Sequence, residues 1–317
     1  MIIEAKGLVK RYGDTLAVDN IDLEVRRGSI VGVLGPNGAG KTTTLRMLTT
    51  LARPDAGSAR VAGFDVVHEA ASIRRIIGVT GQDATLDELL SGRQNLVMTG
   101  ELSRMGRTRS RKRAQELLEL LELEEAADRP VKGYSGGMRR RLDLAASIVS
   151  KPPILFLDEP TTGLDPTGRQ KIWNIIRDLV ESGATVLLTT QYLDEADALA
   201  DEIVVINHGR VIAQGSPLQL KAATGSQLLE VSLPEPHPAA ASVLAGIGAG
   251  KVVVSDAGKH LRVHSSNGHG LAVAALRALD EAGIPVDDIA VHQPSLDDAF
   301  AALTGKASAA TNNEEVQ

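Results

Sequence analysis

The sequence has no cysteine, and aromatic residues make up only 2% of it. Disulfide bonds and thiolate metal sites are therefore excluded. No apolar run approaches the roughly 18 residues that a membrane span requires, and the N-terminus has no apolar signal-peptide core. These absences predict a chain that is soluble by itself, so any work at a membrane would need spans from another polypeptide.

The charge and the length of the chain further narrow the classes of protein to which it can belong. The formal net charge of −6 argues against a nucleic-acid binder with a broad basic surface. At 317 residues, of which 43% are hydrophobic, the chain is long enough for two domains with packed cores.

The clearest motif present is a phosphate-binding loop at residues 35–43. GPNGAGKTT fits the pattern G-x-x-x-x-G-K-[ST], with a predicted buried strand (residues 29–34) before it and a predicted helix (residues 43–52) after it. In this context backbone N–H groups and a helix N-terminus surround a phosphate, Lys41 is expected to contact the β- and γ-phosphates, and Thr42 to bind Mg²⁺. The alternative is a glycine-rich turn that occurs by chance, which would not require a strand before it and a helix after it. The expected nucleotide contacts are Gly35, Pro36, Asn37, Gly38, Ala39, Gly40, Lys41, Thr42 and Thr43.

Two carboxylates follow a second predicted buried strand, in ILFLDEP at residues 154–160. Because successive strand residues point to opposite faces, Asp158 and Glu159 are predicted to have different roles. Asp158 lies where ligands bind in parallel sheets and is expected to hold Mg²⁺ through water. Glu159 is expected to polarise the water that attacks the γ-phosphate. Without the phosphate loop, an Asp-Glu-Pro that merely leaves a strand would be an equal alternative.

Strand and helix patterns alternate over residues 1–220 and predict an α/β fold of the P-loop NTPase type with a mostly parallel sheet. Segments 58–61 and 76–80 are expected to continue that sheet. Residues 83–150 carry leucines at helical spacing and predict a helical insert. Within it, the basic run 107–113 is expected to be a solvated helix start rather than a nucleic-acid site, because an acidic stretch follows it.

The C-terminal part has a different pattern. Residues 221–305 show the order β-α-β-β-α-β and predict a small α+β domain of the ferredoxin-like kind. His260 and His264 have the spacing of a metal pair on a helix, but they fall in a predicted strand, so surface histidines are expected. Residues 306–317 are polar and small, and are expected to be disordered.

Three motifs taken together, GPNGAGKTT, YSGGM and LFLDEPTTGLD, resemble those of the nucleotide-binding subunits of ABC transporters over about residues 2–220. The resemblance implies ATP and Mg²⁺ as ligands. YSGGM resembles the family signature, in which Ser135, Gly136 and Gly137 form a second phosphate cradle at a helix N-terminus. That cradle closes on the ATP held by the opposite subunit, which implies a head-to-tail homodimer with two ATP molecules.

The resemblance implies further roles. Tyr12 falls where the family stacks an aromatic ring on adenine, the alternative being a surface tyrosine. Gln82 falls on the glutamine that contacts Mg²⁺ and signals to the membrane subunit, whereas Gln94 lies in a helical run and is not assigned. Asp165 belongs to the loop that crosses the dimer interface. Gln191 replaces a histidine found in most of the family, and we expect its amide to contact the γ-phosphate as a neutral donor.

These roles give two sets of residues. The predicted catalytic residues are Lys41, Glu159 and Gln191. The predicted metal site comprises Thr42, Gln82 and Asp158.

TTQYLDEAD, VTGQD and HQPSLDDAFAALTG together resemble the daunorubicin/doxorubicin-resistance type of ABC ATPase. This implies an ATPase at the cytoplasmic face of the cell membrane that powers efflux of a drug, such as an anthracycline, through a separate membrane permease, with no nucleic-acid partner. An exporter of lipid or polysaccharide, an importer, and a soluble ABC-type ATPase acting on ribosomes or DNA are the alternatives. The C-terminal domain is expected to be regulatory or to dock a subunit.

Overall fold

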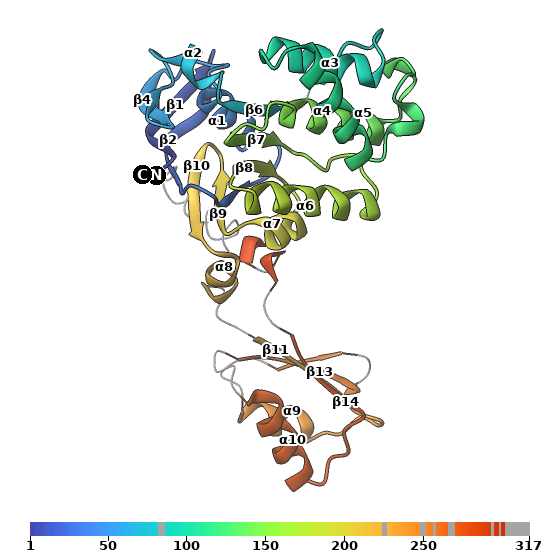
Figure 1. Cartoon of the computed structure of the whole chain (residues 1–317). Coiled ribbons are helices and arrows are strands. Elements are labelled where there is room, and N and C mark those ends of the chain that lie inside the picture. The colour runs from blue at the N-terminus through green and yellow to red at the C-terminus, as the bar shows by residue number, and fades with distance from the viewer. Residues whose placement is uncertain are drawn as a thin grey trace. The chain divides into compact units, whose positions relative to one another are not determined.

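The chain divides into two compact units, Met1–Ser216 and Pro217–Gln317 (Figure 1). The structure is a computed structural model, and it describes residues 1–81, 86–223, 227–247, 252–255, 258–265, 270–292, 295–297 and 299–301.

A six-stranded sheet forms the centre of the first unit, in the order β10-β9-β3-β8-β7-β6. All neighbours pair in parallel except β9 and β10, which pair antiparallel. Strands β3, β7 and β8 are buried along their whole length, as parallel strands covered on both faces are. The strands are β3 (Ile30–Leu34), β6 (Ile77–Thr80), β7 (Ile154–Asp158), β8 (Thr185–Thr190), β9 (Glu202–Asn207) and β10 (Arg210–Gly215).

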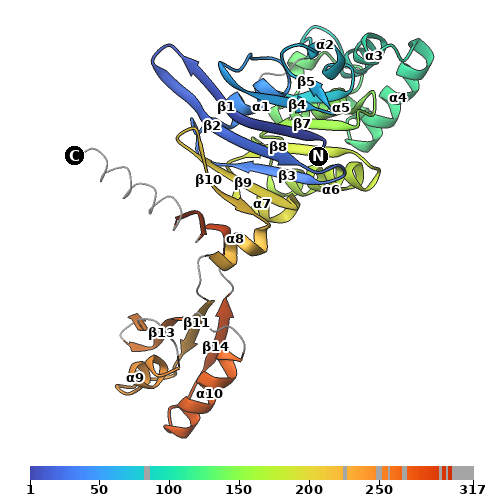
Figure 2. The ribbon, with the colours of Figure 1, turned by 90° about the vertical axis from the view of Figure 1, so that its left-hand side faces the viewer.

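A second, antiparallel sheet lies beside the first in the order β2-β1-β4-β5 (Figure 2). Its strands are β1 (Ile3–Tyr12), β2 (Thr15–Val25), β4 (Ala56–Val61) and β5 (Phe64–Asp65). The prediction that residues 58–61 continue the same sheet as residues 76–80 is wrong, because β4 pairs antiparallel with β1. The reason is visible in the burial pattern: Ala59 and Val61 are buried and Arg60 between them is exposed, which suits a sheet with one solvated face.

Helix α1 (Lys41–Leu48) packs between the two sheets, with contacts to β2 and β4 on one side and to β7 and β8 on the other. The hydrophobic cluster around it joins Ile3 and Leu8 of the antiparallel sheet to Phe156 of the parallel sheet. The other helices that flank the sheets are α2 (Ala70–Ile73), α6 (Pro166–Glu181) and α7 (Leu193–Leu199).

The predicted helical insert contains three helices and no named strand among its described residues. They are α3 (Gly92–Leu102), α4 (Arg107–Leu120) and α5 (Gly136–Ile148), with 3-10 turns at Glu124–Ala126 and Val131–Gly133. A second hydrophobic cluster, which includes Leu96, Leu117 and Leu142, fixes them to the parallel sheet. Helix α4 begins with exposed basic side chains, as predicted for the run 107–113.

The second unit has its own core, built around Leu229, Val231 and Leu261. Its sheet is antiparallel, in the order β12-β13-β11-β14. The order β-α-β-β-α-β of its elements after α8 agrees with the sequence prediction. The elements are α8 (Pro217–Ala223), β11 (Gln227–Ser232), α9 (Ala240–Ala245), β12 (Val252–Ser255), β13 (His260–Ser265), α10 (Leu271–Glu281) and β14 (Asp288–His292).

Among the described residues, no helix is both long and apolar enough to cross a membrane. The same residues contain no group of three or more histidine and acidic side chains that could hold a metal ion. The predicted disordered tail, residues 306–317, lies outside the part of the chain that the structure describes.

Candidate nucleotide site

The phosphate-binding loop connects β3 to α1 at the carboxyl edge of the parallel sheet. Two of its glycines are required by close backbone neighbours. A Cβ atom at Gly35 would lie 2.2 Å from the carbonyl oxygen of Ile206, and one at Gly40 would lie 2.5 Å from that of Ala17. Gly40 also has a φ of 107°, a conformation that residues with side chains rarely adopt. The loop is therefore held between β9 and β2.

The ammonium group of Lys41 is buried inside this loop. Its Nζ donates hydrogen bonds to the carbonyl oxygens of Gly35 (2.8 Å) and Pro36 (3.1 Å), and it lies 3.6 Å from Oε1 of Glu159. Burial lowers the pKa of Lys41, and the charges of Glu159 and Asp158 oppose this shift. A buried cation beside a row of loop amides suits a polyphosphate, to which Lys41 can transfer its hydrogen bonds.

Asp158, at the end of β7, is almost fully buried and faces α1. Its Oδ1 accepts hydrogen bonds from the hydroxyl of Thr42, at 3.1 Å, and from the hydroxyl of Thr189 on β8. A threonine hydroxyl beside a carboxylate is an all-oxygen donor set, which is the kind that Mg²⁺ prefers. The residues at this point therefore fit a magnesium ion.

Glu159 follows directly and contacts different partners. Its φ of 50° is in the left-handed region, and its backbone N–H donates to the carbonyl and hydroxyl oxygens of Thr189, both at 3.1 Å. Its Oε2 accepts a hydrogen bond from the hydroxyl of Thr162 (3.2 Å). The backbone turn at Glu159 thus directs this carboxylate toward Lys41, while the Asp158 carboxylate faces Thr42.

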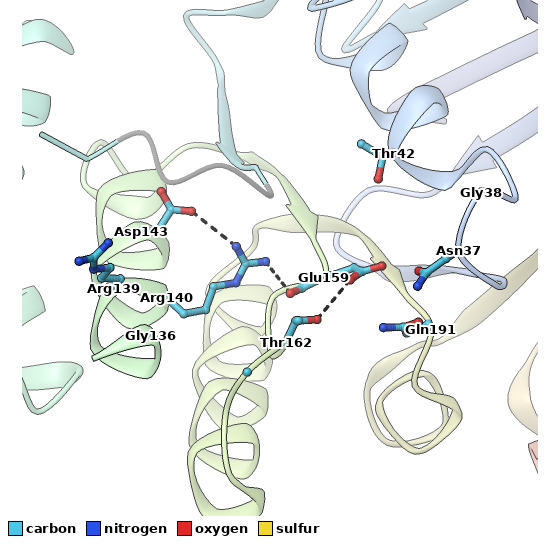
Figure 3. A pocket seen from close by; sticks show the side chains of 11 residues that line it. Asn37, Gly38, Thr42, Gly136, Arg139, Arg140, Asp143, Glu159, Thr162 and Gln191 are labelled. Carbon is cyan, nitrogen blue, oxygen red and sulfur yellow. Dashed lines mark hydrogen bonds and ion pairs between the residues drawn. The ribbon is translucent and has the colours of Figure 1, made fainter. Parts of the chain in front are cut away.

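A cavity of about 740 Å³ opens beside Glu159 (Figure 3). In Figure 3 the side chains of Glu159, Gln191, Asn37 and Thr162 lie on one side of it, and α5 of the helical insert lies on the other. Gln191 follows β8 and so reaches the cavity from the same sheet edge as Glu159. The lining residues are Asn37, Gly38, Thr42, Gly136, Arg139, Arg140, Asp143, Glu159, Thr162, Gly163 and Gln191.

A second cavity, of about 460 Å³, also borders the phosphate loop. Residues 37–43 line it together with residues 15–17 of β2, Glu159 and His208. Tyr12 is not in this lining. It pairs with Thr15 in the β1–β2 hairpin, its side chain is 49% exposed, and the Lys10 ammonium lies 5.5 Å from its ring centroid.

Ser135 of the signature and Asp165 of the loop after β7 both act as helix N-caps. The Ser135 hydroxyl accepts a hydrogen bond from the backbone N–H of Met138 (3.2 Å) at the start of α5. Gly136 lines the larger cavity, and a Cβ atom at Gly137 would lie 3.1 Å from a methyl carbon of Leu164. Asp165 accepts a hydrogen bond from the N–H of Gly168 (3.1 Å) at the start of α6.

Of the two glutamines weighed for the metal site, Gln82 lies outside the described residues. Gln94 caps α3: its side-chain oxygen accepts from the N–H of Ser91 (2.8 Å), and the Ser91 hydroxyl accepts from the N–H of Gln94 (3.2 Å). This reciprocal capping box gives Gln94 a structural role, which agrees with leaving it unassigned.

Arg140 connects α5 to β7, the strand that carries the two carboxylates, and it was not predicted from the sequence as a site residue. Burial lowers its pKa, and the charges of Asp143, Asp158, Glu159 and Glu195 oppose the shift. The only signal in the sequence was the run of three arginines at 139–141, which does not indicate which one points inward. The guanidinium of Arg140 donates to the carbonyl oxygens of Gly81, Asp158, Glu159 and Pro160.

Comparison with known proteins gives a consistent answer. The model of the ABC transporter family matches residues 18–162. A daunorubicin resistance ATP-binding protein of Streptomyces coeruleorubidus is 52% identical, over 96% of both chains. A daunorubicin/doxorubicin resistance ATP-binding protein of Streptomyces peucetius is 50% identical, over 99% of this chain and 95% of its own.

A solved structure shares the architecture of the first unit. It is a dimeric ATP-binding cassette in a post-hydrolysis state, bound to ADP and phosphate. It superimposes with a TM-score of 0.64 at 28% identity, over 68% of this chain and 98% of its own. With a phosphate loop, paired carboxylates and a signature helix around one cavity, the chain belongs to the ATP-binding subunits of ABC transporters, in the group of the daunorubicin and doxorubicin resistance proteins, and is an ATPase.

Proposed function

We propose that this ATPase powers the export of an anthracycline-type drug through a separate integral-membrane permease, which it binds at the cytoplasmic face of the membrane. The observation that carries the proposal is the extent of the likeness. The family model matches only residues 18–162, whereas identity with the drug-resistance relatives extends over 96–99% of the chain. The second unit, which lies outside the residues that the family model matches, is therefore shared with those drug-resistance proteins.

Binding of ATP is assigned to the phosphate loop. Its amides and Lys41 hold the β- and γ-phosphates, and the exposed ring of Tyr12 stacks on adenine. Thr42 and Asp158 hold Mg²⁺, with Gln82 as a further contact. The bound Mg²⁺ would neutralise charge that develops on the transferred phosphoryl group.

Hydrolysis is assigned to Glu159, which accepts a proton from a water molecule as that water attacks the γ-phosphorus in line with the bond to the β-phosphate. That bond breaks, and ADP and phosphate are released. Lys41 gives up its hydrogen bonds to the loop carbonyls and stabilises the phosphate oxygens. Gln191 donates a neutral hydrogen bond to the γ-phosphate, without the charge that a histidine could carry.

Each chain carries two half-sites, its phosphate loop and its signature cradle, and neither is complete without a second copy of the chain. Ser135, Gly136 and Gly137 of one chain complete the site of a second copy, and Asp165 lies at the interface between them. The N-terminus of α5 supports this assignment because its glycines keep the backbone amides accessible at the edge of the 740 Å³ cavity. The dimeric state of the solved relative supports it as well.

The decisive experiment is co-expression of the chain with its membrane subunit in drug-sensitive cells. Daunorubicin accumulation should fall relative to cells that carry the membrane subunit alone, and Glu159→Gln should abolish the effect. If accumulation does not change while ATP hydrolysis is intact, the drug assignment is wrong and the ATPase assignment stands.

A further inference from the structure

A fully buried carboxylate that the proposed mechanism does not use lies behind the catalytic loops. Glu195 on α7 has no exposed surface. Its Oε1 accepts hydrogen bonds from the hydroxyl of Thr161 (2.8 Å) and from the indole N–H of Trp173 on α6 (3.1 Å). Its Oε2 is also buried, and no hydrogen bond of normal geometry reaches it from any described residue. Such a group is costly to bury, which calls for an explanation.

The carboxylate joins two segments that carry proposed site residues. Thr161 belongs to the loop that starts at Glu159 and ends at Asp165. Glu195 lies one turn beyond Gln191, at the start of α7. The hydroxyl of Thr190, directly before Gln191, accepts from the N–H of Tyr192 (2.9 Å). One buried side chain therefore connects the loop after β7 to the segment after β8.

Several groups around Glu195 oppose the effect of its burial. Burial raises the pKa of Glu195, and the hydroxyls of Thr190 and Thr161, the indole of Trp173 and the charge of Arg169 oppose the shift. Arg169 lies over the rings of Trp173 (5.3 Å) and Tyr192 (4.5 Å).

Arg169 also ties the two helices together at the surface, because its Nη2 lies 2.7 Å from Oδ1 of Asp194 on α7. Its Nε is nevertheless buried without a hydrogen-bond partner among the described residues. One cluster thus contains a donor on Arg169 and an acceptor on Glu195, both buried, that make no hydrogen bond of normal geometry with a described residue, while the Thr190 hydroxyl still opposes the rise in the pKa of Glu195. Buried atoms of this kind are uncommon in folded proteins and call for an explanation.

We propose that Glu195 is a positioning residue that couples the Gln191 segment to the loop 159–165, so that the nucleotide state at Gln191 changes the placement of Glu159 and of the interface residue Asp165. This inference rests on the proposed roles of Glu159 and Gln191. The hydrogen bond from Thr161 carries the coupling, and the bond from Trp173 anchors the carboxylate to α6.

The junction contains its own reporter. Trp173 is the only tryptophan of the chain, and its indole N–H bonds to the carboxylate in question. If the junction rearranges when nucleotide binds, the fluorescence of Trp173 must change, because indole emission responds to the loss or gain of a hydrogen bond to a charged group.

The test uses Thr161→Val, which keeps the shape of the side chain and removes its donor, with Thr161→Ser as the variant that restores the hydroxyl. Thr99→Val is the matched control, because the Thr99 hydroxyl donates only to the Asn95 carbonyl of its own helix (2.9 Å). Each full-length protein is assayed for kcat and KM for ATP, for thermal unfolding, and for the change in Trp173 emission on addition of ATP and Mg²⁺.

We expect Thr161→Val to lose at least tenfold in kcat with KM for ATP within twofold, and to lose most of the ATP-induced change in emission. Thr161→Ser should restore both, and Thr99→Val should leave both unchanged. Wild-type kcat and a wild-type emission change in Thr161→Val would overturn the proposal. So would a loss in kcat that leaves the emission change intact.

If Thr161→Val does not fold, Glu195→Leu decides the matter, because it removes the acceptor of the bonds from Thr161 and Trp173. It must then show reduced kcat with an altered emission change, and wild-type values in both would overturn the coupling. Failure of the proposed function is distinct: the wild-type protein would then bind or hydrolyse no ATP, whereas failure of this inference leaves both intact.

Discussion

Lys41 and Glu159 face each other beside the phosphate loop, with Nζ 3.6 Å from Oε1 and side-chain exposures of only 4% and 11%. Because both charges are largely removed from water, each depends on the other for compensation. The proposed mechanism divides this pair, because Lys41 moves to phosphate oxygens and Glu159 contacts a water molecule. In that proposal the two residues pair with each other before nucleotide binds and act separately during hydrolysis.

Glu159→Gln should bind ATP but lose about 10²–10⁴-fold in kcat, because an amide cannot accept the proton of the attacking water. Retention of labelled ATP and release of phosphate measure the two effects separately. Glu181→Gln, on the exposed end of α6, is the matched control and should hydrolyse ATP normally. Phosphate release by Glu159→Gln at the wild-type rate would remove Glu159 from the catalytic role.

Gln191→Ala should lower kcat about tenfold or more, because it removes a donor that is proposed to contact the γ-phosphate in the transition state. Gln191→His can also donate a hydrogen bond and should keep more activity than the alanine variant at neutral pH. Steady-state rates of both variants over a series of ATP concentrations provide the measurement. An unchanged rate in Gln191→Ala would show that the side chain does not contact the reacting phosphate.

Arg140→Met should destabilise the protein and reduce kcat together, because it leaves several buried carbonyl groups without a donor, each costing about 1–3 kcal/mol. Arg141→Met is the control: the described hydrogen bonds of Arg141 go to Leu121 (2.8 Å) and Glu122 (3.4 Å), at the end of α4. Thermal unfolding and ATP hydrolysis measure the two effects. Equal losses of stability and kcat in both variants would mean that the contacts of Arg140 with the end of β7 contribute no more than those of Arg141.

Two inactive variants should restore activity to each other if the site is shared between chains. Gly137→Asp places a negative charge in the signature cradle, and Lys41→Ala removes the phosphate-loop cation, so each protein alone should be inactive. An equimolar mixture contains heterodimers with one complete site, and should recover about a quarter of the wild-type rate if dimers form at random and sites act independently. No recovery in mixtures shown to exchange subunits would contradict the head-to-tail dimer.

The stability of Glu195→Gln relative to the wild type should depend on pH. Burial raises the pKa of Glu195 above its ordinary value of 4.5, so the folded state binds this proton more tightly than the unfolded state. Ionisation of the buried Glu195 carboxylate destabilises the wild-type protein. This destabilisation is absent below pH 4.5, grows as the pH rises through the interval between the unfolded-state and folded-state pKa values, and is complete above the folded-state pKa.

Because glutamine does not titrate, the difference in unfolding free energy should move in favour of Glu195→Gln as the pH rises from about 4 to 8. Denaturant unfolding at a series of pH values measures this difference. A difference that does not vary with pH would mean that the pKa of Glu195 is the same in both states.

The parts of the fold that were predictable from sequence are those whose physical requirements are local. The burial of β3 and β7 follows from their continuous apolar runs, and the loop follows from two positions that suit only glycine, Gly35 because of a close backbone neighbour and Gly40 because of its positive φ. Helix starts at Ser135 and Asp165 follow from N-cap chemistry. Each of these features can be read within a window of a few residues.

The features that escaped prediction depend on residues far apart in sequence. The place of residues 58–61 in the antiparallel sheet is decided by pairing with β1, some fifty positions earlier. Nothing near Arg140 shows that its guanidinium reaches Gly81 and the end of β7. Glu195 reads as an ordinary acidic residue of a helix start, and only the fold reveals that it is buried between Thr161 and Trp173.

The backbone at Glu159 has a consequence for how this protein can vary. A left-handed residue other than glycine costs about 1–3 kcal/mol and persists only when its surroundings hold it there. Here Thr189 holds the N–H and Arg140 holds the carbonyl. Glycine would suit that backbone better than any other residue, yet it would remove the carboxylate. Selection for thermal stability alone would therefore favour loss of the carboxylate at this position, and its presence there agrees with the role in turnover that we propose for Glu159.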